Sequence, residues 1–241
     1  VKGEAGSPYA IKDYYDIDPD LAEEPSTRMQ EFEALVTRTH EVGLKVVLDF
    51  VPNHVARQYH SDTAPEGVDD LGAHDNKEMH FSPSNNFYYI PRQAFTPQFY
   101  IGEGEERYFE YPAKATGNDC FGAFPGEYDW YETVKLNYGV DYTGGGRCHF
   151  DPIPDTWYKM LDILLFWCGK GADAFRCDMA HMVPVEFWNW AISKVKENYP
   201  SVIFIAEIYD QALYRVYIEK GKFDYLYDKV GLYDKLRGVL C

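Results

Sequence analysis

The runs Gly171-Ala-Asp-Ala-Phe-Arg-Cys-Asp178 and Val202-Ile-Phe-Ile-Ala-Glu207 are both short and mostly apolar, and both end on a carboxylate. Residues 185–198, which lie between them, are expected to form a helix of about one crossover length. A strand, a helix and a second strand in this order predict a parallel α/β unit, in which successive strands end at the same edge of the sheet. We therefore expect Asp178 and Glu207 to lie close together.

Elements on either side extend this pattern. Residues 26–41 have the spacing of an amphipathic helix, with Ser26 or Thr27 as its N-cap and Gly43 after its end. Residues 45–51 form an apolar run typical of a buried parallel strand. Further helices are expected over 156–168 and 211–220, and a short strand over 223–227. Four strands of a parallel α/β arrangement are thus visible, where a closed (β/α)8 barrel needs eight.

The long segment after the first strand has a different character. Residues 55–152 are rich in Gly, Pro, Asn, Tyr and His and show little sustained periodicity. A structureless loop of that length is uncommon, so the segment is interpreted as a small irregular domain inserted into the barrel. The expected organisation is a barrel segment over 1–54, the insertion over 55–152 and a second barrel segment over 153–241.

The amino-acid composition favours some kinds of binding partner and disfavours others. The net charge of −16 disfavours nucleic acid and anionic lipid, because a phosphate backbone would be repelled. The 21 Tyr exceed what a core requires and suit stacking on sugar rings, although aromatic residues also pack in loops. No run of 18 apolar residues predicts a membrane span, and the five cysteines form no CxxC pair. We expect a soluble chain, either cytoplasmic or exported, whose oligomeric state stays open.

The strand ends carry residue types that suit catalysis. Arg176 and Asp178 are two residues apart and so share one face of their strand, where the arginine is expected to lower the pKa of the carboxylate. A structural ion pair explains the same spacing. Glu207 follows Ile203 and Ile205 on its face, and apolar surroundings suit a proton donor. Two carboxylates at one rim, one ionised and one protonated, are the groups that cleave a glycosidic bond.

Three motifs at strand ends together resemble the α-amylase family of retaining glycoside hydrolases and transglycosidases (glycoside hydrolase family 13). Asp49-Phe-Val-Pro-Asn53-His54 is similar to its first signature, Ala174-Phe-Arg176-Cys-Asp178 to its second and Ile205-Ala-Glu207 to its third. The segments Pro8-Tyr9-Ala-Ile-Lys-Asp13-Tyr14-Tyr15 and Lys135-Leu-Asn137 resemble two further family segments. The motifs follow the family order over nearly the whole chain.

The resemblance implies a fold and a set of roles. The fold is a (β/α)8 TIM barrel, of which the chain carries about strands three to six, with the insertion as domain B. Asp178 is implied as the nucleophile, Glu207 as the acid/base and Arg176 as the residue that positions the nucleophile. The implied substrate-binding residues are Tyr9, Asp49, His54 and His181, the last in a His-Met pair where many members carry Lys-His. Asn53, Lys135 and Asn137 are implied as structural residues where the barrel meets domain B.

The resemblance also implies the activity, an α-glucan-active retaining hydrolase like α-amylase, acting on oligosaccharide or polysaccharide through a covalent glycosyl-Asp178 intermediate. Two alternatives stay open. One is an α-glucan transglycosylase or maltosyltransferase, because water and a sugar hydroxyl resolve the same intermediate, and residues 178–188 are similar to maltosyl-transferring relatives. The other is a non-catalytic carbohydrate-binding fragment. The family's third catalytic Asp has no match here, so little activity is expected from these 241 residues alone.

No cofactor or metal is expected. Many family members hold Ca²⁺ with the Asn that matches Asn53 and an Asp of domain B, and Lys135 stands at that Asp position. An ammonium group cannot coordinate Ca²⁺, so calcium stays possible but disfavoured, and the ammonium of Lys135 is expected near Asn53. The seven His and five Cys show no spacing typical of zinc.

Overall fold

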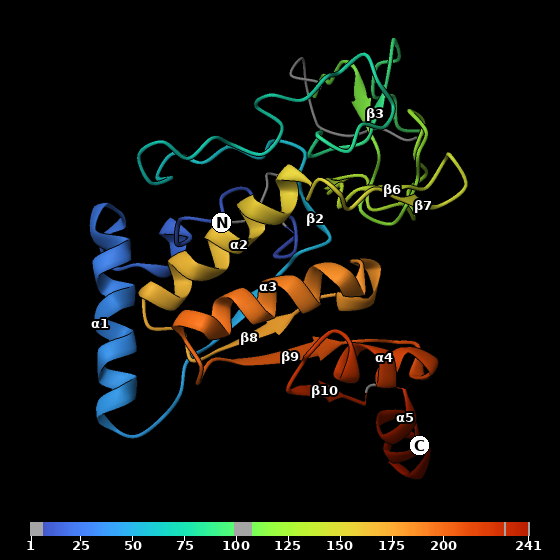
Figure 1. The fold of residues 1–241 in the computed structure, drawn as a ribbon. Coiled ribbons are helices and arrows are strands. Elements are labelled where there is room, and N and C mark those ends of the chain that lie inside the picture. Colours follow the sequence, from blue (N-terminus) through green and yellow to red (C-terminus); the bar gives the residue numbers. More distant parts are fainter. Residues whose placement is uncertain (1–6, 99–107, 229, 241) are drawn as a thin grey trace. The chain divides into compact units, whose positions relative to one another are not determined.

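The computed structural model describes residues 7–98, 108–228 and 230–240. The chain divides into two compact units. Unit 1 consists of Val1–Asp16 and His54–Lys159, and unit 2 of Ile17–Asn53 and Met160–Cys241. Figure 1 shows the elements of both units. Among the described residues, none of the helices combines the length and the apolar character that crossing a bilayer requires.

Unit 2 is built on a parallel sheet (Figure 1). Its four strands lie in the order β1 (Val47–Phe50), β8 (Ala174–Cys177), β9 (Ile203–Glu207) and β10 (Tyr225–Tyr227), and every pair is parallel. The strand order follows the chain order, as in the wall of an α/β barrel. The parallel α/β arrangement predicted from the sequence is therefore confirmed, with strands one to three residues shorter at one or both ends.

The helices of unit 2 occupy most of the predicted positions. They are α1 (Arg28–Glu41), α2 (Asp155–Gly169, which begins in unit 1), α3 (Val185–Asn198), α4 (Tyr214–Glu219) and α5 (Gly231–Leu240). Short 3-10 turns are η1 (Pro19–Leu21), η2 (Pro25–Thr27), η3 (Ala180–Met182) and η4 (Gln211–Leu213). Helix α3 runs along the sheet, and its Trp188 ring lies 6.4 Å from that of Phe50 on β1. This aromatic contact joins helix and sheet in the core of the unit.

Helix α1 differs from the prediction in one detail. Thr27 occupies the predicted N-cap position but caps no backbone N–H, because its hydroxyl lies within hydrogen-bond distance of the Glu24 carbonyl and of Glu31 instead. Gly43, expected after the helix, has φ +76°, a left-handed conformation that glycine adopts without strain. Helix α5 was not predicted, and none of its described side chains is buried.

Unit 1 is irregular, as its composition predicted. Apart from the start of α2, the regular structure in the described part of this unit consists of three antiparallel pairs: β2 (His54–Ala56) with β5 (Thr133–Lys135), β3 (Tyr89–Ile90) with β4 (Ala113–Lys114), and β6 (Val140–Asp141) with β7 (Arg147–Cys148). Turns make up most of the remaining described residues. Short strands of two or three residues supply few backbone hydrogen bonds, so side-chain contacts must hold this unit together.

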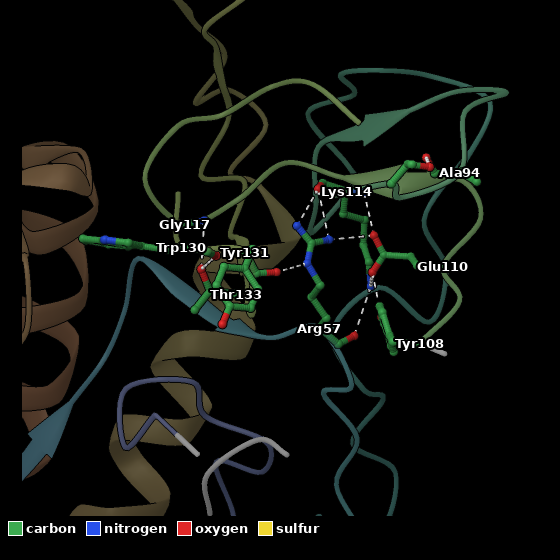
Figure 2. Close-up of polar contacts among 10 residues, drawn as sticks. Arg57, Ala94, Tyr108, Glu110, Lys114, Gly117, Trp130, Tyr131 and Thr133 are labelled. Carbon is green, nitrogen blue, oxygen red and sulfur yellow. Dashed lines mark hydrogen bonds and ion pairs between the residues drawn. The ribbon is translucent and has the colours of Figure 1, made fainter. Parts of the chain in front are cut away.

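A buried ion cluster around Arg57 supplies such contacts (Figure 2). Arg57 Nη1 donates to Glu110 Oε1 at 2.7 Å, and both terminal nitrogens donate to the Lys114 carbonyl at 3.2 Å. The Nε group donates to the carbonyl of Tyr131, and the guanidinium carbon lies 3.7 Å from the centre of the Phe95 ring. The Arg57 and Glu110 side chains are only 5% and 7% exposed. One guanidinium therefore joins four separate segments of unit 1.

The Arg57–Glu110 pair should contribute strongly to stability. We expect Glu110→Gln to lower the free energy of unfolding by about 3 kcal/mol, because it leaves a buried guanidinium without its counter-charge. The matched control is Glu219→Gln, which breaks the surface pair with Arg215, whose side chains are 85% and 58% exposed. That change should cost less than about 0.5 kcal/mol. Urea denaturation measures both, and equal losses would contradict the assigned role of the cluster.

Candidate active site

Asp178 and Glu207 meet at the carboxyl edge of the sheet of unit 2. Asp178 follows β8 directly, and Glu207 is the last residue of β9. Arg176 joins them, since its Nη1 lies 2.8 Å from Asp178 Oδ1 and its Nη2 lies 2.8 Å from Glu207 Oε2. The two carboxyl groups also influence each other, since Glu207 raises the pKa of Asp178. The predicted convergence of the two strand ends is confirmed.

The guanidinium of Arg176 has partners on all four strands. In addition to the two carboxylates, Nη1 contacts Asp49 Oδ1 on β1 at 2.8 Å, and Nε and Nη2 donate to the Tyr227 hydroxyl on β10 at 3.2 and 2.7 Å. Burial alone would lower the pKa of Arg176, but its hydrogen bonds to Asp49 and Tyr227 raise that pKa above its usual range. The arginine is therefore a permanent cation at the centre of the site, and Asp49 has a partner that explains a carboxylate within an apolar strand.

The net shift of the Asp178 pKa is opposite to the one expected from Arg176. The pKa is raised to about 7, because burial and the neighbouring Glu207 together raise it by more than Arg176 lowers it. Arg176 therefore acts in the predicted direction, but removal from water and a second carboxylate outweigh it. Two adjacent buried carboxyl groups disfavour each other's ionisation, which is one cause of the raised pKa of Asp178.

The surroundings of Glu207 also differ from the prediction. The side chain is buried, and polar groups contact its carboxyl. The backbone N–H of Met179 donates to Oε2 at 3.1 Å, and the hydroxyl of Tyr209 donates to Oε1 at 3.1 Å. Donors of this kind stabilise the ionised form of a carboxyl group. The expectation of apolar surroundings is therefore wrong.

Two tyrosines of this site were not singled out from the sequence. Tyr209 lies two residues after Glu207, and Tyr227 lies opposite Glu207 in the register of β9 and β10. Tyr209 could have been predicted from the sequence, because it lies only two residues after Glu207. Tyr227 could have been found only from the strand register, because twenty residues separate it from Glu207 in the sequence.

His181 lies close to these residues in unit 2. It belongs to η3, and its ring centre is 6.0 Å from that of Tyr209, whose hydroxyl contacts Glu207. The ring Nδ1 is buried and has no hydrogen-bond partner within the described part of the chain. The predicted contact of His181 with substrate stays a prediction.

Tyr9 and His54 belong to unit 1. His54 lies on β2, its ring centre is 5.2 Å from that of Trp130, and Tyr9 is 42% exposed. Burial lowers the pKa of His54 to about 4, Lys135 lowers it further and a backbone hydrogen bond to Tyr9 opposes both, so the imidazole is neutral near pH 7. A neutral imidazole can donate to a sugar hydroxyl without attracting an anion. The assignment of both residues to a sugar subsite stays a prediction.

The residues expected where barrel and domain B meet are all buried. Lys135 pairs with Asp119 at 2.6 Å, and the Asn137 amide donates to the carbonyls of Ser82 and Asn85 at 2.8 and 2.9 Å. Asn53 belongs to unit 2 and Lys135 to unit 1, so their proximity stays a prediction. In the part of the chain that the structure describes, no group of three or more His, Cys, Asp or Glu could hold a metal ion.

The geometry agrees with comparisons to known proteins. A model of the α-amylase catalytic domain matches residues 4–136, which is more than half of the chain. The chain therefore belongs to the α-amylase family. Its sheet is part of the (β/α)8 barrel of that catalytic domain.

Individual relatives are similar over part of their length. An α-1,4-glucan:maltose-1-phosphate maltosyltransferase of Cereibacter sphaeroides is 37% identical over 91 residues, covering 35% of the chain and 15% of the relative. The enzyme of that name from Picrophilus torridus is 24% identical over 216 residues, covering 86% and 24%. The crystal structure of an α-amylase from Lactobacillus plantarum is 27% identical with a TM-score of 0.56, covering 97% of the chain and 43% of that structure. The chain thus spans less than half the length of these proteins.

The raised pKa of Asp178 predicts a pH-dependent stability. The folded carboxyl binds a proton more tightly than the unfolded one, so its contribution to stability is lost as the pH rises from about 4 to about 7. We expect Asp178→Asn to stabilise the chain relative to wild type by on the order of 2 kcal/mol more at pH 7.5 than at pH 4. Exposed Asp234→Asn is the control and should show no such trend. Urea denaturation at both pH values measures the difference, and a stabilisation independent of pH would contradict the assignment.

Proposed function

We propose that the protein carrying this chain is an α-glucan-active enzyme that cleaves glycosidic bonds with retention of configuration. The observation that carries the proposal is the contact between Asp178, Arg176 and Glu207 at one edge of a parallel sheet. One guanidinium contacts both carboxyl groups at 2.8 Å, which holds the two close together, as in retaining enzymes, whose carboxyl groups lie closer than those of inverting ones. Membership of the α-amylase family supports the same reaction class.

The reaction proceeds in two displacements. In the first, Asp178 attacks the anomeric carbon, the bond to the leaving oxygen breaks and the proton of Glu207 passes to that oxygen. In the second, Glu207 takes a proton from water or a sugar hydroxyl, whose oxygen attacks the same carbon and releases Asp178. Arg176 stays charged throughout and stabilises the ionised form of Asp178.

Substrate binding must redistribute the proton of the pair. The first step needs Asp178 ionised and Glu207 protonated, whereas burial raises the pKa of Asp178 to about 7 without substrate. A sugar ring between the carboxyl groups separates them and leaves Arg176 as the charged partner of Asp178. Loss of the Glu207 contact removes a cause that raises the pKa of Asp178, so the proton moves to Glu207.

The remaining assignments belong to the same proposal. Tyr9, His54, Asp49 and His181 bind the sugar, and residues 55–152 form domain B between the two barrel segments. The retained Asp178, Glu207 and Arg176 favour an enzyme over a non-catalytic carbohydrate-binding protein, since such a protein has no need of this pair.

Glycosyl transfer is the second candidate function. The curated relatives are named α-1,4-glucan:maltose-1-phosphate maltosyltransferases, which supports transfer to a sugar acceptor. Hydrolysis and transfer share the glycosyl-Asp178 intermediate and differ in the group that resolves it. Products from maltoheptaose in ¹⁸O-water distinguish them, because hydrolysis places the label on the new reducing end and transfer does not.

The covalent intermediate provides the direct test. A 5-fluoro-α-glucosyl fluoride should form an ester on Asp178 with release of fluoride, detected by mass spectrometry of the digested protein. Asp178→Asn should not be labelled. Glu207→Gln should still be labelled, because fluoride leaves without protonation, but the label should turn over at least about 100-fold more slowly without the base. Label on another residue would contradict the assignment of the nucleophile.

We also propose that the protein needs no calcium at Asn53. Lys135 is buried beside Asp119, and an ammonium group there supplies positive charge without a metal. EDTA should therefore leave the melting temperature unchanged within error, measured in parallel with an α-amylase known to bind calcium. A drop of several degrees that added calcium restores would refute this proposal.

A further inference from the structure

The hydroxyl of Tyr227 makes two hydrogen bonds at the centre of the site. It accepts from Arg176 Nε at 3.2 Å and from Arg176 Nη2 at 2.7 Å. A phenol has two lone pairs and one proton, and Arg176 can only donate, so both lone pairs are used and the proton is available to Glu207, which lies opposite Tyr227 in the strand register.

The strand register sets this arrangement. Tyr227 is the last residue of β10 and lies opposite Glu207, the last residue of β9. Parallel neighbours in register carry their side chains to the same face, and the phenol is long enough to reach beyond Glu207 to Arg176 on β8. The ring therefore closes a polar network that crosses three strands.

We propose that Tyr227 is a positioning residue that holds Arg176 against Glu207 and favours the ionised form of Glu207. The catalytic consequence of this role rests on the proposed function. Among the described residues of unit 2, the charged and titratable groups that face Glu207 include Arg176, Asp178, Tyr209 and Tyr227. Arg176 and the two hydroxyls all favour a charged Glu207, whereas the negative charge of Asp178 opposes it.

The functional consequence concerns the second displacement. Glu207 gives up its proton as an acid in the first step and must be ionised to take one as a base in the second, so a donor that stabilises its ionised form prepares it for the base role. The same donor lowers the pH at which Glu207 loses the proton it needs as an acid. Tyr227 thereby sets the alkaline limit of activity.

The test is Tyr227→Phe, which removes one oxygen and keeps the ring. The matched control is Tyr225→Phe on the same strand, where the hydroxyl makes no hydrogen bond within the described residues and the side chain is 60% exposed. The ¹³C carboxyl resonance of Glu207, assigned by its loss in Glu207→Gln, is followed in a pH titration of each protein without substrate. We expect its midpoint to rise by about 0.5–1 pH unit in Tyr227→Phe only.

A pH–rate profile of the full-length enzyme completes the test. The alkaline limb of kcat/KM should move up with the midpoint, and kcat near pH 7 should fall about tenfold in Tyr227→Phe. The proposal would be overturned if Tyr227→Phe lowered the rate equally at every pH and moved neither the alkaline limb of kcat/KM nor the midpoint of the Glu207 titration. That result would mean that the tyrosine has only a structural role. A midpoint that moves in a protein whose Asp178 takes no fluoroglycosyl label would support the role of Tyr227 and refute the proposed function instead.

Discussion

The contacts of the Arg176 guanidinium are the constraint on which the arrangement of the site depends. One planar cation touches Asp49 on β1, Asp178 after β8, Glu207 on β9 and Tyr227 on β10. The guanidinium presents its donors in a fixed plane, so side chains of four strands must reach defined positions around it. A lysine could supply the charge but not this geometry. The strand order of the sheet brings all four partners within reach.

The two carboxylates show how similar groups acquire different tasks. Asp178 shares Arg176 with Asp49 and lies in a buried position that opposes its ionisation. Glu207 is surrounded by the Met179 N–H and the tyrosine hydroxyls, which favour its ionised form. In the proposed reaction Asp178 must be ionised, whereas its pKa is raised without substrate. On that proposal, substrate binding has to supply the difference, which would couple recognition of the sugar to activation of the nucleophile.

Much of the fold could be predicted from the sequence, because apolar runs and helical spacing are local signals. The four parallel strands and the meeting of Asp178 with Glu207 follow from these patterns and from the rule for parallel strands. The Arg57–Glu110 pair could not be predicted, because its members are 53 positions apart in a segment without periodicity. The pKa of Asp178 was predicted in the wrong direction, because spacing reveals a neighbouring charge but not the depth of burial.

The two arginine clusters differ in their access to water, and this difference governs their response to dissolved salt. Arg57 and Glu110 are almost completely enclosed, so mobile ions cannot screen their attraction. Asp49 is 48% exposed and its partner Arg176 is 20% exposed, which lets ions approach that pair. Rising ionic strength therefore loosens the hold of Asp49 on Arg176 while the interior of unit 1 stays unaffected. Arg176 then interacts mainly with Asp178 and Glu207. The electrostatic interactions at the carboxyl edge of the sheet therefore depend on the ionic strength.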